Sequence, residues 1–229
     1  MDTTIWYTLG TLGMAGGSAY ALWGWSIDDG DTDTFYVVLA LITGVATLAY
    51  AAMALGLGQL PTKGAIFYLP RYVDWLITTP LIVLYLAMIA RPARRVYVGL
   101  VALEVIVIGS GAAAAFTPRP VHWIAYLIGT AAFVGILYVL LRVLPRQAAL
   151  QSHRPAAIFT KLRNLTVVLW SIYPLVWLLG PFGFEVLLVE TEAIVVTYLD
   201  LLAKVGFVVI AVNGRDALSA LQRASLTPS

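Results

Sequence analysis

The sequence predicts an all-α integral membrane protein in which seven transmembrane helices form one bundle. Two observations carry this prediction. The 229-residue chain is 61% hydrophobic and only 11% charged, with a mean hydropathy of +0.89, whereas soluble domains have about 25% charged residues. Its apolar residues also fall in segments of roughly 20 residues, the length that crosses a bilayer as a helix. We expect residues 1–229 to form a single domain.

Seven apolar segments follow one another along the chain, separated by residues typical of turns. The expected helices are 4–26, 34–58, 70–91, 95–116, 121–142, 161–181 and 186–212. Polar residues, glycine and proline mark the separators at 28–31, 59–64, 91–92, 117–120, 145–155 and 180–181. No basic residue precedes the first segment, and it is too long for the core of a signal peptide, so we expect it to span the membrane.

Composition also excludes several classes of function. The chain has no cysteine, which excludes disulfides and thiolate metal sites. Its two histidines, His122 and His153, lie at or near loop signals and lack the spacing of metal ligands. The net charge of +2 is too small to indicate nucleic-acid binding, and no motif suggests it. We therefore expect neither a metal nor a nucleic-acid partner.

The basic residues predict how the chain is oriented in the membrane. With the N-terminus outside, the outer loops hold two basic residues, Lys63 and Arg119. The inner loops and tail hold ten, namely Arg91, Arg94, Arg95, Arg142, Arg146, Arg154, Lys161, Arg163, Arg215 and Arg223. Cytoplasmic loops are enriched in Lys and Arg. We expect a multi-pass protein of the plasma membrane with an extracellular N-terminus and a short cytoplasmic tail from about residue 213.

A few ionisable residues of the apolar segments are expected to be buried within the membrane. They are Arg71, Asp74, Glu104, Asp200 and Lys204. Such residues are costly at mid-membrane depth unless they are paired or line a cavity, so they indicate a functional site. A buried lysine amine readily loses its proton and can then condense with an aldehyde as a Schiff base. Asp200 lies four residues before Lys204, on the same helix face, where a carboxylate can neutralise the resulting cation.

Charge balance supports grouping four of these residues. With Lys204 as a cation, it and Arg71 contribute two positive charges, and Asp74 and Asp200 contribute two negative ones. A low-dielectric site favours such neutrality. Glu104 stands apart, and we expect it to be uncharged and bonded to a hydroxyl such as that of Thr79.

Two further stretches carry side chains on one helix face. Arg71, Asp74 and Thr78 share a face of the third segment. In the sixth segment Trp170, Tyr173 and Trp177 form an aromatic stripe, which is a rigid slot for a long, flat apolar ligand. Anchoring at the membrane interface is the alternative interpretation of these aromatics.

Three stretches together resemble the microbial (archaeal-type) rhodopsins. They are Arg-Tyr-Val-Asp-Trp-Leu-Ile-Thr-Thr-Pro-Leu at 71–81, Trp-Ser-Ile-Tyr-Pro-Leu-Val-Trp at 170–177 and Tyr-Leu-Asp-Leu-Leu-Ala-Lys-Val-Gly-Phe at 198–207. The resemblance covers essentially the whole chain. It implies a seven-helix bundle that binds all-trans retinal covalently through Lys204, and a photoreceptor rather than an enzyme.

The resemblance also implies roles for individual residues. Asp74 is the expected counterion and acceptor of the Schiff-base proton after light isomerises retinal, and Asp200 and Arg71 complete the counterion complex. Tyr50 is expected to bond the aspartates. The expected retinal-lining residues are Trp75, Thr79, Val107, Gly129, Trp170, Tyr173 and Trp177. An aspartate at position 74 argues against the halide pumps of the family.

The choice between a sensor and a pump depends mainly on Tyr85. Proton pumps of the family have a carboxylic acid at this position, which returns a proton to the Schiff base. A phenol with a pKa near 10 is a poor donor, so we expect a long-lived state suited to signalling. The stretch 81–92 also resembles sensory rhodopsin II, the phototaxis receptor of haloarchaea.

Other positions bear on the same comparison. Val107 and Gly129 fit a blue-shifted pigment, and Tyr198 matches the tyrosine that faces the membrane-embedded transducer. Ala203 departs from the pattern, because sensory rhodopsin II has a hydroxyl residue there. This departure is typical of the intermediate middle rhodopsins. The alternative function is a light-driven outward proton pump, with weak activity or with activity in the absence of a transducer. The sequence leaves open whether the protein forms a homo-oligomer.

Two glutamates lie near the start of the seventh segment. Glu190 and Glu192 are expected to be solvated loop carboxylates, and the alternative is an extracellular proton-release group.

Overall fold

The computed structural model describes residues 3–28, 32–62 and 65–226, with side chains through Ser219 and at Leu221. Lys63, one of the two basic residues expected outside, lies beyond the described residues. The elements in chain order are α1 (Thr3–Ser26), α2 (Asp33–Ala54), β1 (Gln59–Pro61), β2 (Ile66–Tyr68), α3 (Leu69–Ala90), α4 (Arg94–Phe116), α5 (Val121–Tyr138), η1 (Val139–Val143), α6 (Leu144–Ala148), α7 (His153–Trp170), α8 (Tyr173–Leu179), α9 (Val189–Leu201), η2 (Leu202–Gly206), α10 (Phe207–Asn213) and α11 (Arg215–Leu226).

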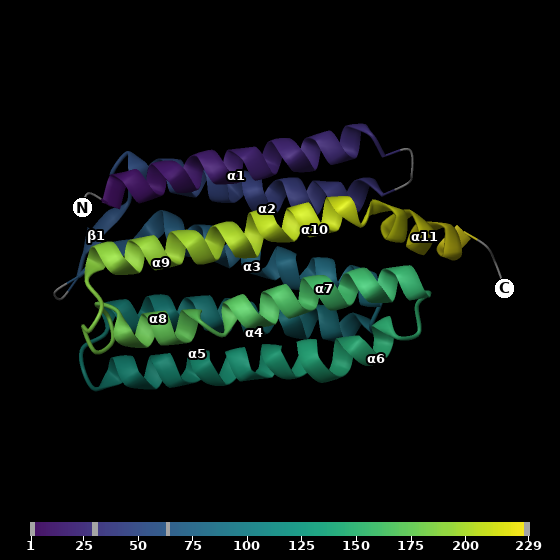
Figure 1. Ribbon diagram of the computed structural model, residues 1–229. Helices are drawn as coiled ribbons and strands as arrows, with labels where there is room; N and C mark the ends of the chain where they lie inside the picture. The colour runs from purple at the N-terminus through teal and green to yellow at the C-terminus, as the bar shows by residue number, and fades with distance from the viewer. Residues whose placement is uncertain (1–2, 29–31, 63–64, 227–229) are drawn as a thin grey trace.

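These elements form seven long rods that run side by side, as predicted (Figure 1). Among the described residues, six helical stretches are long and apolar enough to cross a membrane, beginning with Asp33–Ala54 and ending with Val189–Asn213. The seventh rod is α1, which has 24 residues, none of them charged, and packs along α2. The all-α membrane bundle predicted from the sequence is therefore confirmed.

The fifth and sixth rods differ from the expected boundaries. The fifth continues through the π-helical turn η1 and α6 to Ala148, and the sixth begins at His153, so most of the expected separator 145–155 is helical. Pro145 lies in the first turn of α6, where a missing N–H costs little. The sixth rod is interrupted after Trp170 and resumes at Tyr173, because Pro174 cannot donate a hydrogen bond to the Trp170 carbonyl.

Two short elements were not predicted. The separator after α2 contains a two-stranded antiparallel sheet in which Leu60 pairs with Phe67. At the opposite end of the bundle, the expected polar tail forms the helix α11, whose Leu218 is fully buried. Its backbone carbonyl at Leu221 accepts a 3.0 Å hydrogen bond from Arg91. Residues 215–226 therefore form a helix that packs against the end of the bundle, and not a free tail.

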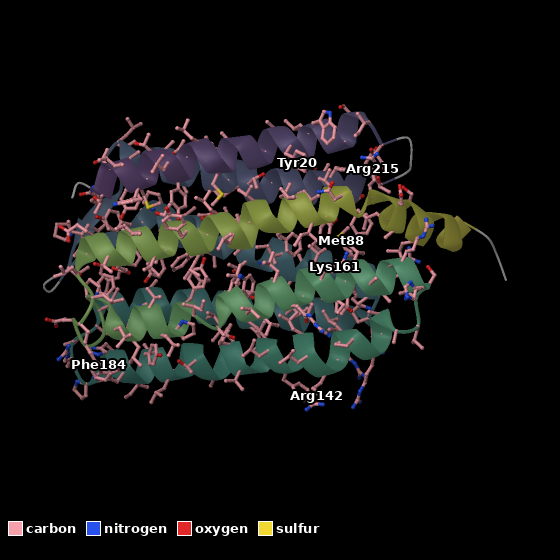
Figure 2. All side chains as sticks on the ribbon, viewed as in Figure 1. Tyr20, Met88, Arg142, Lys161, Phe184 and Arg215 are labelled. Atoms are coloured by element: carbon pink, nitrogen blue, oxygen red, sulfur yellow. The ribbon has the colours of Figure 1, made fainter. Side chains whose placement is uncertain are left out.

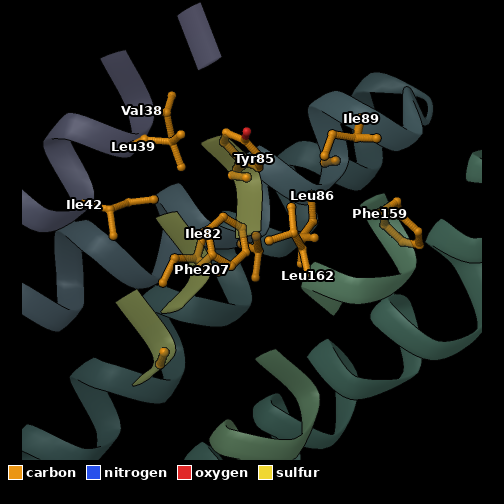
Figure 3. Packing of buried hydrophobic residues seen from close by; sticks show 14 of the residues in the cluster. Val38, Leu39, Ile42, Ile82, Tyr85, Leu86, Ile89, Phe159, Leu162 and Phe207 are labelled. Atoms are coloured by element: carbon orange, nitrogen blue, oxygen red, sulfur yellow. The ribbon is translucent and has the colours of Figure 1, made fainter. Parts of the chain in front are cut away.

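The buried side chains divide the bundle into two halves. The larger apolar cluster lies mainly in the half toward α11 and includes Leu39, Leu86 and Phe207 (Figure 3). A smaller cluster at the other end contains Tyr7, Tyr50 and Tyr68. Figure 2 shows Arg142, Lys161 and Arg215 in the half toward α11, and Phe184 at the opposite end. The two ends therefore differ in chemistry as the basic residues predicted.

Candidate functional site

The site forms around Lys204, which lies in the π-helical turn η2 at the middle of the seventh rod. Its side chain is 2% exposed. The amine Nζ donates a hydrogen bond to Oδ2 of Asp74 on α3 and lies 3.7 Å from Oδ2 of Asp200, one turn earlier on its own rod. The structure therefore brings together, away from solvent, the lysine and both carboxylates that the sequence singled out.

Asp200 is held by donors from three other rods. Its Oδ2 accepts a 2.8 Å hydrogen bond from the Tyr50 hydroxyl, and its Oδ1 accepts one of 2.5 Å from the Tyr173 hydroxyl. The Trp75 indole nitrogen donates to the same carboxylate at 3.2 Å. Tyr50 takes this position because Gly10 of α1 lets the helices approach, since a Cβ there would lie 2.2 Å from the Tyr50 ring. Both oxygens of Asp200 are thus committed to fixed partners.

Asp74 has fewer partners than Asp200. Its Oδ2 binds Lys204, whereas its Oδ1 is buried and has no hydrogen-bond partner among the described residues. The neighbouring Thr78 hydroxyl donates to the Asp74 backbone carbonyl at 2.9 Å. Of the two carboxylates at the amine, Asp74 is therefore the one with a free oxygen.

Arg71 turns away from this cluster. Its guanidinium donates to the Tyr7 hydroxyl at 3.2 Å and lies 3.7 Å from Oε1 of Glu192. It also lies over the Tyr68 ring, 5.2 Å from the centroid. No ion pair joins Arg71 to Asp74 or Asp200 in the described part of the chain. Arg71 thus acts on the lysine cluster at longer range than a direct ion pair.

Glu192 is the site residue that sequence reasoning placed wrongly. It lies in the first turn of α9 with a side chain only 16% exposed, so it is not a solvated loop carboxylate. Its charge changes the expected balance of two cations and two carboxylates to two cations and three carboxylates. Tyr7 and Tyr68, which complete the surroundings of Arg71, were also missed, because single tyrosines in apolar segments carry no distinguishing pattern.

An apolar cavity extends from Lys204 between the rods. All seven residues expected to line it do so: Trp75, Thr79, Val107, Gly129, Trp170, Tyr173 and Trp177. Tyr50 contacts Asp200 instead of the cavity. Gly129 allows α4 and α5 to approach, because a Cβ there would lie 2.4 Å from Oγ of Ser110.

Two more polar residues border the cavity. Glu104 is 2% exposed, lies near the Thr79 hydroxyl as expected, and leaves its Oε1 without a partner among the described residues. Tyr126 of α5 stacks on Trp177 with centroids 4.8 Å apart and donates to the Pro174 carbonyl at 3.1 Å. Tyr126 therefore connects α5 to α8 beside the interruption of the sixth rod. The amino-acid sequence did not indicate this role.

The chemical groups at this site define which kind of ligand it can bind. It offers one buried amine next to two carboxylates, at the edge of a cavity with aromatic walls. A long, flat apolar aldehyde fits, because the amine can condense with its carbonyl and the carboxylates can neutralise the cation that results. Among the described residues no group of His, Cys, Asp and Glu could hold a metal ion. These features define a seven-helix membrane protein with a lysine-centred ligand site.

Comparison with known proteins identifies the family. The family model described as bacteriorhodopsin-like protein matches residues 1–218. Sensory rhodopsin-2 of Haloarcula vallismortis is 44% identical over 209 residues, which are 91% of this chain and 89% of that protein. Sensory rhodopsin-2 of Natronomonas pharaonis is 37% identical, over 99% of this chain and 94% of that protein.

Solved structures agree with the sequence comparison. The thermophilic rhodopsin of Rubrobacter xylanophilus superimposes with a TM-score of 0.93 at 39% identity, and the match covers 97% of this chain and 100% of that one. The chain belongs to the bacteriorhodopsin-like family, the microbial rhodopsins.

Proposed function

We propose that this protein is a retinal-binding photoreceptor whose light-triggered step is a proton transfer from Lys204 Nζ to Asp74. The observation that carries the proposal is the buried contact between this amine and the Asp74 carboxylate, at the edge of an aromatic cavity. Membership of the bacteriorhodopsin-like family supports retinal as the ligand. Retinal, bound covalently to Lys204 in its all-trans form, would supply the absorption of light and the isomerisation.

The two carboxylates beside Lys204 have different roles. Asp200 receives three hydrogen bonds and serves as the fixed negative charge that orients the Lys204 nitrogen. Asp74 accepts the proton, because it contacts the amine directly and keeps Oδ1 free of other donors. The aromatic residues Trp75, Trp170 and Tyr173 hold the ligand and exclude water from the nitrogen.

The proposal also includes a long-lived signalling state. Tyr85, at the position where the family's pumps have an acid, is fully buried, between the rings of Phe35 and Phe207. A phenol in apolar packing releases protons poorly, so Lys204 regains its proton slowly. The relatives named sensory rhodopsin-2 support the same interpretation.

A membrane-embedded transducer is the proposed partner. Tyr198 on α9 is 56% exposed and so is available to a helix of another protein in the bilayer. Ala203 is buried and has no hydroxyl, and the Tyr173 hydroxyl bonds Asp200 instead. Signalling in this chain must therefore use a contact other than a hydrogen bond between positions 203 and 173.

The proposed orientation places α11 in the cytoplasm. Arg142, Lys161 and Arg215 lie toward that end of the bundle (Figure 2), and such an excess of basic residues is typical of cytoplasmic loops. Protease accessibility of a tag fused after residue 229, in right-side-out and inverted vesicles, tests this orientation.

Reconstitution with all-trans retinal tests ligand binding. We expect a visible absorption band in the wild type and in Lys161→Ala, whose lysine is exposed, and no band in Lys204→Ala. A band that persists in Lys204→Ala would refute the covalent site.

A second experiment separates the sensor from the outward proton pump. We expect flash photolysis of Tyr85→Asp to recover the visible band at least tenfold faster than the wild type, since a positioned general acid contributes about 10²–10⁴-fold. Fast recovery in the wild type, together with light-driven acidification outside intact cells, would instead establish the pump.

A further inference from the structure

The cavity that begins at Lys204 reaches the hairpin formed by β1 and β2. Ile66 and Tyr68 of β2 line it, together with Tyr72 and Phe182. Ile66 is also 40% exposed, so this strand lies between the cavity and the surface. The hairpin belongs to the end of the bundle opposite α11 (Figure 1). At that end, access of solvent to the cavity therefore depends on how tightly the hairpin is seated.

Buried side chains of β2 seat the hairpin on the bundle. Leu60 pairs with Phe67 across the two strands, and the Leu69 N–H donates to the Gly58 carbonyl at 2.9 Å. These backbone interactions close the hairpin on itself. Phe67 and Tyr68 point to opposite sides of the strand, and they are only 2% and 7% exposed. Each of the two rings therefore fills a different gap in the bundle.

The Phe67 ring fills a gap where α3, α4 and the segment after α8 meet. It stacks on Tyr72 of α3, with centroids 4.2 Å apart and planes 25° apart. Phe116, the last residue of α4, lies 4.7 Å away, and Phe182 lies 6.5 Å away. Tyr72 and Phe182 line the cavity, whereas Phe116 is 52% exposed. The Phe67 ring therefore lies between the cavity wall and the surface.

Tyr68 fills the neighbouring gap, where the surroundings are polar. Its ring lies 5.3 Å from the Tyr7 ring and 5.2 Å from the Arg71 guanidinium. The ion pair between Arg71 and Glu192 borders the cavity on this side, and such groups can hydrogen-bond to water. The rings around Phe67 offer water little in exchange for its hydrogen bonds. On the Phe67 side, exclusion of water therefore depends on the bulk of one apolar side chain.

We propose that Phe67 is a plug that seals this end of the cavity and keeps water and water-soluble nucleophiles away from the Lys204 nitrogen. Replacing Phe67 with alanine removes the whole ring, and the void that remains lies between the exposed Phe116 and the cavity-lining Tyr72. The void joins the cavity to solvent. Protection of a Schiff base at Lys204 rests on the proposed function, whereas protection of the free amine does not.

The reactivity of Lys204 in the retinal-free protein tests the plug directly. Formaldehyde with cyanoborohydride methylates accessible amines, and peptide mass spectrometry gives the rate at Lys204 relative to the exposed Lys161. We expect Phe67→Ala to raise this relative rate about tenfold or more, because reaction through an opening follows the population of the open form. Phe67→Leu keeps most of the apolar volume and should stay within about threefold of the wild type.

Two other phenylalanines supply matched controls. Phe159 is 1% exposed, and Phe184 is 59% exposed and lies at the end opposite α11 (Figure 2). Phe159→Ala and Phe184→Ala should both react at the wild-type rate. A rate in Phe159→Ala equal to that in Phe67→Ala would indicate general loosening of the bundle and would overturn the plug, as would a wild-type rate in Phe67→Ala. Phe67→Val, with an intermediate rate expected, decides the same question if the alanine variant does not fold.

Hydroxylamine in the dark tests the plug in the retinal-bound protein. It converts a Schiff base to the oxime and the free amine, so the visible band decays. We expect this decay to be about tenfold faster or more in Phe67→Ala, and unchanged in Phe184→Ala. Equal decay in Phe67→Ala and the wild type would overturn the protection of the Schiff base. A wild type without any visible band would refute the proposed function instead, and the methylation rates would still decide whether Phe67 is a plug.

Discussion

Replacing Lys204 with alanine should destabilise the protein even in the absence of retinal. The substitution leaves Asp74 and Asp200 in a buried site without the cation that both face. At the 3.7 Å separation between Lys204 Nζ and Asp200 Oδ2, a pair of unit charges attracts by about 4 kcal/mol at an effective dielectric constant of 20. Removing one partner of a buried ion pair costs about 3–5 kcal/mol. We therefore expect the free energy of unfolding to fall by about 3–5 kcal/mol.

A second substitution should restore most of that loss. Adding Asp74→Asn to Lys204→Ala removes one of the two uncompensated carboxylates and leaves an amide of nearly the same size. Asp200 keeps its three hydrogen-bond donors in this double variant. The assay is equilibrium unfolding of the retinal-free protein in mixed micelles, with Lys161→Ala as the control for loss of an exposed lysine.

The result can refute the reasoning in two ways. If Lys204→Ala unfolds at the same denaturant concentration as the wild type, the amine does not compensate the carboxylates. If the double variant is less stable than Lys204→Ala, the cost comes from lost packing around the lysine stem and not from charge.

Two further predictions concern packing and the second ion pair. Gly129→Ala should destabilise the protein by about 1–3 kcal/mol, because the new methyl group meets Oγ of Ser110 at 2.4 Å. Adding Ser110→Ala should recover stability. A loss that persists in the double variant would contradict this steric cause. Glu192→Gln should lower the free energy of unfolding by about 1–3 kcal/mol, whereas Glu185→Gln should change it by roughly 0–1 kcal/mol. The ion pair of Glu185 with Arg119 is shorter than that of Glu192 with Arg71, at 3.3 Å against 3.7 Å, but the side chains of the Glu185 pair are largely exposed. Equal losses of stability in the two variants, measured by the same unfolding assay, would refute burial as the deciding factor.

Much of the site could be predicted because the signals for it are local. A lysine in a long apolar segment is improbable unless it is paired or functional, and a carboxylate four residues earlier must lie on the same helix face. These two facts are enough to place Lys204 and Asp200 side by side. The same helical spacing placed Trp170, Tyr173 and Trp177 along one cavity wall, where the structure has them.

The sequence did not indicate partners that come from a different rod. Arg71 shares a helix face with Asp74, yet its guanidinium binds Glu192 and Tyr7. The sequence indicated only that Arg71 and Asp74 lie on one helix face. The long arginine side chain reaches Glu192, which the packing of α9 against α1 brings near it.

The sequence by itself determined the membrane class, the seven rods and the buried charged residues, because hydrophobic length and helical periodicity are properties of single segments. Only the tertiary structure decided which carboxylate keeps an oxygen without a partner among the described residues, and which partner Arg71 takes. Those features depend on the rotation and approach of whole helices. Close contacts at glycines such as Gly10 and Gly129 set that approach, and no local pattern encodes it.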